Sequence, residues 1–177
     1  MKKVLLVLLV GLLSTTVAMA AGLQVGVKCP EFSLKDSAGN TYSLETPPYA
    51  GKVVAIFYTD KASSDKNPQV EQRLKAAKFD PKTYKSMVIL NLKDTPLPNF
   101  ILKKIIMKRQ EELKSPILVD ENHILVNAWG LNEKAYNVVL VDKGRVVRYI
   151  FRGAERAVMP PVEVDKLIAL IREYHAK

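Results

Sequence analysis

The chain has 177 residues, of which 48% are hydrophobic, and a single cysteine. One cysteine excludes an intramolecular disulfide framework, and a chain of this length can bury a core that needs neither a metal nor a disulfide to fold. The formal net charge of +9 favours acidic partners or an anionic membrane surface.

The N-terminal residues predict a cleaved export signal, residues 1–20. Lys2 and Lys3 precede an apolar run over residues 4–13, and Ala18-Met19-Ala20 offers small residues for signal peptidase. The run is well short of the ~20 residues that span a bilayer. We therefore expect a soluble, periplasmic or secreted mature domain over residues 21–177, with a net charge of +7 once the two lysines are removed. An exported chain does not meet the chromosome, so we expect no nucleic-acid partner.

The first half of the mature chain predicts a hairpin and then a strand-helix-strand unit. Residues 27–34 and 41–44 are expected to be short strands around a turn at residues 36–40. Lys52 to Tyr58 is expected to be a central strand, because its residues 53–57 are continuously apolar, as in a strand covered on both faces. A helix from Asn67 to Phe79 and a strand from Ser86 to Leu92 follow, which predicts two parallel neighbours.

The second half predicts helices around a further hairpin. In chain order we expect an amphipathic helix at 97–113 burying Ile101, Ile105, Ile106 and Leu113, a strand at 117–119, a helix at 124–129, strands at 136–141 and 145–151, and a last helix opened by Pro160-Pro161. This order is typical of a thioredoxin-like α/β fold, with three α/β/α layers, a mixed central sheet and an N-terminal β-hairpin extension.

The position where that fold carries redox chemistry has no cysteine. In thioredoxins the catalytic thiols lie where the first central strand meets its helix, and here residues 58–66 read Tyr-Thr-Asp-Lys-Ala-Ser-Ser-Asp-Lys. The cis-proline position would fall near Tyr136, yet no proline occurs between Leu131 and Met159. Thiol-disulfide exchange needs two sulfurs, so we assign no catalytic residue to this junction and expect a non-catalytic protein.

The same junction is the candidate binding face. Its lysines and the first amides of the helix could bind a small anionic ligand or a periplasmic protein, and the alternative is a solvated polar loop. The candidate residues are Thr59, Asp60, Lys61, Ser63, Ser64, Lys66 and Tyr136.

Cys29 supports a different hypothesis. It could be a reactive thiol of an oxidoreductase or a peroxiredoxin-like enzyme, with a partner supplying the second sulfur, or it could simply be buried. His123 and His175 lack neighbours at the spacing of a zinc site, so we predict no metal and no cofactor. The basic stretch over residues 103–109 could contact an anionic membrane surface or form the outer face of a packed helix.

Three segments together resemble the YtfJ family of small periplasmic bacterial proteins. They are residues 61–79, the run Leu118-Val119-Asp120 with Ala128-Trp129-Gly130-Leu131, and residues 138–146, which read Val-Val-Leu-Val-Asp-Lys-Gly-Arg-Val. The resemblance implies an exported thioredoxin-like protein without a cysteine pair and supplies no catalytic residues.

Overall fold

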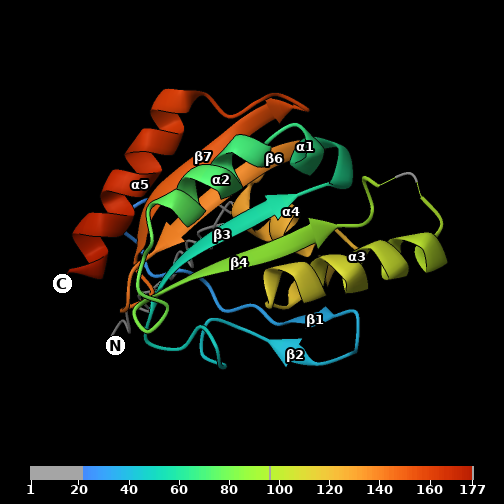
Figure 1. The fold of residues 1–177 in the computed structure, drawn as a ribbon, viewed down its shortest axis with the longest axis horizontal. Coiled ribbons are helices and arrows are strands. Elements are labelled where there is room, and N and C mark those ends of the chain that lie inside the picture. Colours follow the sequence, from blue (N-terminus) through green and yellow to red (C-terminus); the bar gives the residue numbers. More distant parts are fainter. Residues whose placement is uncertain (1–21, 96, 177) are drawn as a thin grey trace, which may run out of the picture.

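The computed structural model describes residues 22–95 and 97–176, which form one seven-stranded sheet with helices on both faces (Figure 1). The predicted export signal lies outside the described residues. Within the described residues, no helix is both long and apolar enough to cross a membrane.

The elements follow the predicted order. The strands are β1 (Leu34–Asp36), β2 (Thr41–Tyr42), β3 (Val53–Thr59), β4 (Tyr84–Asn91), β5 (Ile117–Asp120), β6 (Ala135–Val141) and β7 (Val147–Glu155). The helices are α1 (Lys61–Asp65), α2 (Pro68–Ala76), α3 (Asn99–Leu113), α4 (Ile124–Trp129) and α5 (Pro161–His175).

The sheet is mixed, with the order β2-β1-β5-β4-β3-β6-β7. Strands β3, β4 and β5 are parallel, whereas β6 is antiparallel to β3, and β7 and β1 are antiparallel to their neighbours. The predicted strand-helix-strand unit and the C-terminal hairpin are therefore confirmed. The carboxyl ends of the three parallel strands meet at one edge of the sheet, which is also where β6 begins.

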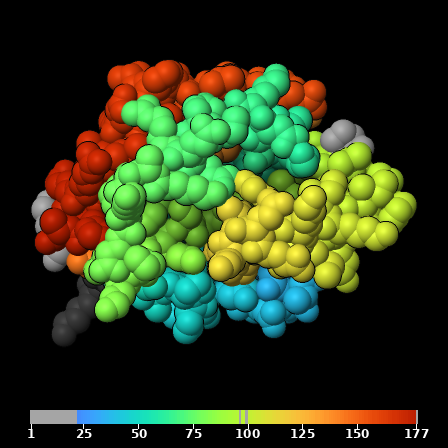
Figure 2. Space-filling view, viewed as in Figure 1, coloured from blue at the N-terminus to red at the C-terminus, as the bar shows by residue number. Residues whose placement is uncertain are grey.

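Strand β3 is buried along its whole length because both of its faces are covered. Val53, Ala55 and Phe57 pack with α2 and α5 in one core, and α2, α3 and α5 lie across this face in Figure 2. Residues Val54 and Ile56 point to the opposite face, where α4 packs. The three predicted layers are thus present.

Trp129 lies in the core on the α4 face. Its side chain is 1% exposed and meets the ring of Phe32 edge to face at a centroid distance of 5.2 Å. The burial of this tryptophan, the only one in the sequence, makes it a core anchor and not part of a binding face.

The N-terminal hairpin is shorter than predicted. The strand expected over residues 27–34 begins only at Leu34, and before it the chain makes an isolated bridge between Lys28 and Val146. The turn is held by Asp36, whose Oδ1 accepts hydrogen bonds of 2.9 Å from the amides of Ala38 and Asn40. The predicted strand is longer than the observed one, because continuous pairing with neighbouring strands begins only at β1, which lies between β2 and β5.

Helix α3 packs largely with the predicted side, and Ile101 is the exception. Leu102 and Ile106, one turn apart, are buried, whereas Ile101 is on the exposed side, with Phe100 and Met107. Apolar residues occur all round this helix, so their spacing does not select one face. The exposed side also carries the lysines of the basic stretch.

Candidate functional site

The junction between β3 and α1 is held by hydrogen bonds between its own residues. Asp60 caps the short helix, and its Oδ1 accepts a hydrogen bond of 3.0 Å from the amide of Ser63. The hydroxyl of Thr59 donates to the carbonyl oxygen of Asp60. These side chains therefore form hydrogen bonds with the local backbone.

Ser63 links this junction to the loop that precedes β6. Its hydroxyl donates a hydrogen bond of 3.0 Å to the carbonyl oxygen of Lys134, which also accepts the amide of Arg156 at 2.7 Å. The amide nitrogen of the Asn67 side chain donates to the carbonyl oxygens of Ser63 and Ala157. The two halves of the position that thioredoxins use for catalysis are thus joined by polar contacts that involve no sulfur.

The structure separates the predicted face into buried and accessible parts. Thr59, Asp60 and Ser63 are at most 2% exposed. Tyr136 is buried against Phe57 at a ring-centroid distance of 6.1 Å, and burial raises the pKa of its hydroxyl. Accessible positions of the predicted face are Lys61 in part, Ser64 and Lys66.

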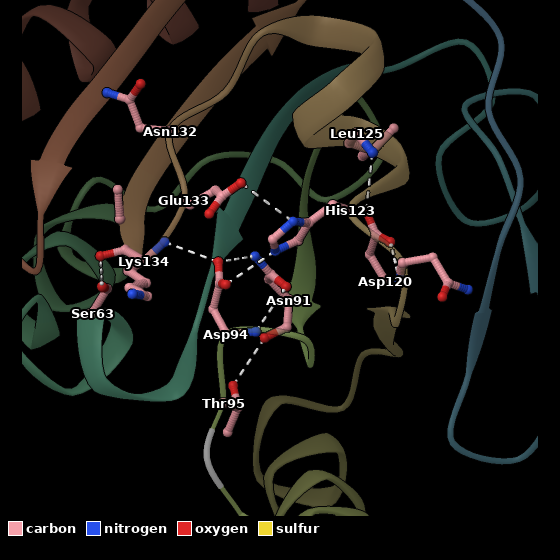
Figure 3. A network of polar contacts seen from close by, with 12 residues as sticks. Ser63, Asn91, Asp94, Thr95, Asp120, His123, Leu125, Asn132, Glu133 and Lys134 are labelled. Carbon is pink, nitrogen blue, oxygen red and sulfur yellow. Dashed lines mark hydrogen bonds and ion pairs between the residues drawn. The ribbon is translucent and has the colours of Figure 1, made fainter.

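A second polar cluster lies at the same edge of the sheet. Asp94 follows β4, His123 precedes α4, and Glu133 precedes β6 (Figure 3). The Nε2 atom of His123 lies 3.0 Å from Oδ1 of Asp94, and its Nδ1 lies 3.5 Å from Oε1 of Glu133. The side chains of Asp94 and His123 are 6% and 7% exposed, while that of Glu133 is 58% exposed.

Hydrogen bonds to the second carboxylate oxygen, Oδ2, fix the side chain of Asp94. Oδ2 accepts hydrogen bonds from the side chain of Asn91 at 2.6 Å and from the backbone amide of Lys134 at 2.9 Å. The hydroxyl of Thr95 in turn donates to the Asn91 carbonyl oxygen. This arrangement leaves Oδ1 directed toward the imidazole.

The His123 ring is positioned by the loop that leads into α4. His123 has a left-handed backbone with φ of 58°, a conformation that is uncommon outside glycine. Asp120 fixes the loop, since its carboxylate accepts hydrogen bonds from the amides of Ile124 and Leu125 at 2.9 and 3.0 Å. The hydroxyl of Tyr58 donates to the same carboxylate, and burial, followed by the charge of Asp120, raises the pKa of Tyr58.

Sequence reasoning missed this cluster because its members come from three loops that are far apart in the chain. The available signal was the position of the polar residues. Asn91 ends β4 and Asp94 comes just after it, while Asp120 ends β5 and His123 comes just after it. Residues after adjacent parallel strands gather at one edge, where open α/β sheets bind their ligands.

Similarity to known proteins identifies the family of this chain. The model of a family described as "Bacterial protein of unknown function (YtfJ_HI0045)" matches residues 21–174. The chain belongs to the YtfJ family. An uncharacterized protein of Haemophilus influenzae is 28% identical over 165 residues, covering 86% of this chain and 90% of that protein. The uncharacterized protein YtfJ of Escherichia coli is 25% identical over 114 residues, covering 63% and 60%.

Solved structures share the fold of this YtfJ-family chain. The exposed lipoprotein thioredoxin Etrx1 of Streptococcus pneumoniae superposes with a TM-score of 0.57 at 19% identity, covering 81% of this chain and 99% of that chain. A secreted disulfide oxidoreductase of Mycobacterium tuberculosis gives a TM-score of 0.55 at 12% identity, covering 80% and 95%. At these identities the structural similarity establishes a thioredoxin-like fold. It says nothing about chemistry, which depends on the residues of each chain.

The one cysteine of this YtfJ-family chain lies away from the edge described above. Cys29 is 3% exposed in the core on the α4 face, and its amide donates to the carbonyl oxygen of Arg145. Burial, opposed by the charge of Arg145, raises the pKa of its thiol to about 12. A thiolate is the nucleophile in disulfide exchange, so this environment disfavours that reaction.

A cavity of about 440 Å³ near the N-terminal hairpin is a weaker candidate. It is lined by Arg145 and by residues of the segments 30–33 and 43–45. Arg145 already pairs with Glu45 at 2.5 Å and lies 3.5 Å from Glu31. The positive charge of Arg145 is therefore already paired with carboxylates of the same chain.

Proposed function

We propose that this YtfJ-family chain is an exported, non-catalytic thioredoxin-fold protein that binds an acidic periplasmic protein at the β3–α1 edge. The observation that carries the proposal is the hydrogen bond from Ser63 to the Lys134 carbonyl oxygen. It places a buried, redox-inert contact at the position where thioredoxins keep their thiols, while leaving the rim accessible.

The rim supports a negatively charged partner. Lys66, Lys134 and Arg156 are exposed, and Ser63 and the Lys134 backbone connect the segments that carry them. Among the described residues, no acidic side chain forms an ion pair with these three cations. A basic rim of this kind accelerates association with an acidic protein.

Export is part of the same proposal. It is supported by the basic, apolar and small-residue segments at the N-terminus and agrees with the exposed and secreted relatives in fold.

The partner is tested by cross-linking in living cells. A photoreactive amino acid at Lys66 is expected to give a specific adduct, because this side chain is exposed at the rim. Lys143 is the matched control, since it is also an exposed lysine but lies at the opposite end of β6. Once the partner is identified, its affinity for the protein without the photoreactive residue is measured. We expect Lys66→Glu combined with Lys134→Glu to weaken this affinity at least about tenfold, and Lys143→Glu to leave it within about twofold. Equal adducts at both positions would contradict the proposed face.

The competing hypothesis is an oxidoreductase that uses Cys29. With thiol reductant present, we expect neither the wild-type protein nor Cys29→Ser to turn over hydrogen peroxide or insulin disulfides above the blank. The reason is burial, which raises the pKa of the thiol to about 12 and so disfavours the reactive thiolate at neutral pH. Turnover by the wild type that disappears in Cys29→Ser would favour the enzyme and sink the binding proposal.

A further inference from the structure

We propose that Asp94, His123 and Glu133 form a binding site for a divalent transition-metal ion, with zinc as the ion that the donor set suits best. One ligand atom from each residue lies within 4.8 Å of the other two. Imidazole nitrogen and carboxylate oxygen are both zinc ligands, and zinc sites with three protein ligands leave a further position to water or substrate.

The contact between His123 and Asp94 has the spacing of two ligands on one ion. Ligand atoms about 2.0–2.2 Å from a metal in tetrahedral or octahedral geometry stand roughly 3.0–3.4 Å apart. Nε2 of His123 lies 3.0 Å from Oδ1 of Asp94, and yet this buried nitrogen makes no hydrogen bond. A buried polar atom without a hydrogen bond is costly, and coordination of a metal would satisfy it.

The surrounding contacts orient the ligands as outer-shell partners do in metal sites. The second oxygen of Asp94 is fixed by Asn91 and by the amide of Lys134, which leaves Oδ1 for the ion. The loop bonded to Asp120 holds His123 in place. Two of the three ligands are therefore set in position before an ion arrives.

Glu133 supplies the accessible side of the site. Its side chain is 58% exposed and at present faces Nδ1 of His123. Metal binding requires this side chain to rotate, so that a carboxylate oxygen reaches an ion held between Nε2 and Oδ1. Water would fill the remaining coordination positions.

The alternative is that His123 pairs with the two carboxylates and binds no metal. The two arrangements differ in their response to zinc. Metal binding goes beyond the proposed partner role, because cross-linking at Lys66 and zinc titration can each succeed or fail without the other.

The experiment is calorimetric titration of Zn²⁺ into the purified, chelator-treated protein carrying no histidine tag. We expect one Zn²⁺ per chain, with a dissociation constant below about 10 µM. Glu133→Gln should weaken binding at least about tenfold, and His123→Gln should weaken it about a hundredfold. Glu121→Gln, an exposed carboxylate on the same loop, and His175→Gln should stay within about twofold.

Co²⁺ provides a readout of the ligand itself. In the wild-type protein we expect paramagnetic shifts of the His123 ring signals in the NMR spectrum and none of the His175 signals. Glu133 is exposed, so its glutamine variant tests the site even if His123→Gln does not fold. The proposal is overturned if zinc binds more weakly than about 100 µM, or if Glu133→Gln and the Glu121→Gln control bind zinc equally well.

Discussion

The hydroxyl of Ser63 donates a hydrogen bond of 3.0 Å to the carbonyl oxygen of Lys134, and this contact joins the start of α1 to the residue before β6. Ser63 is fully buried. We expect Ser63→Ala to lower the free energy of unfolding by about 1 kcal/mol, because the lost bond is buried and the carbonyl oxygen keeps only its bond from Arg156. Urea unfolding followed by circular dichroism measures the change.

Ser64→Ala is the matched control. This serine is the next residue of the same helix, but it is exposed, so its replacement should change stability by less than about 0.5 kcal/mol. If the two variants lose the same stability, the contact with Lys134 does not stabilise the edge as described.

Asp120 provides a second prediction, because its carboxylate organises the loop before α4. It accepts hydrogen bonds from the Tyr58 hydroxyl and from the amides of Asn122, Ile124 and Leu125. Asparagine keeps only one acceptor oxygen and no charge, so we expect Asp120→Asn to cost about 2–4 kcal/mol of unfolding free energy. Thermal and urea unfolding measure the loss.

Glu121→Gln controls for the removal of one acidic charge from this loop. Glu121 is exposed, and its replacement should have an effect below about 0.5 kcal/mol. In addition, Tyr58→Phe and Asp120→Asn should be non-additive by about 1 kcal/mol in a double-mutant cycle, since the two side chains are bonded. Additive effects would argue against that bond.

Tyr49 gives a prediction for alkaline pH. Burial raises the pKa of its hydroxyl to about 12, whereas an unfolded chain has a tyrosine pKa of about 10. The contribution of the neutral phenol to stability is therefore fully present below about pH 10 and is lost as the pH rises toward about 12. In this window the group lowers the unfolding free energy by about 1.4 kcal/mol per pH unit.

Tyr49→Phe should remove this share of the pH dependence. We expect the variant and the wild type to differ by less than about 1.5 kcal/mol at neutral pH, and the variant to lose stability less steeply above pH 10. Urea unfolding at a series of pH values compares the two slopes. Parallel slopes above pH 10 would contradict a buried, neutral Tyr49.

Much of the fold could be predicted because the strongest signals are local. A continuous apolar run gave β3, the periodic apolar residues gave α2 and α5, and α4 has the predicted bounds of Ile124 to Trp129. The missing cysteine and proline also indicated from the sequence that the usual thioredoxin chemistry is not carried at the junction. The buried or exposed state of Cys29, by contrast, depended on how the N-terminal segment packs.

The candidate sites depended more on packing. Tyr136 was proposed for the binding face, and the structure directs its side chain to the core beside Phe57. Strand β6 is buried along its whole length, so both of its faces are covered, which the sequence alone does not state. In α3 the sheet selects Leu102 beside the predicted Ile106.

The sequence by itself determined the order of the elements, the family and the absence of a cysteine pair, because each depends on residues that lie close together in the chain. Only the tertiary structure decided that Asp94, His123 and Glu133 meet. These three residues lie in separate loops. The parallel pairing of β3, β4 and β5 and the antiparallel pairing of β6 with β3 bring these loops to one edge. Contacts between distant residues depend on strand order and register, which local periodicity does not specify.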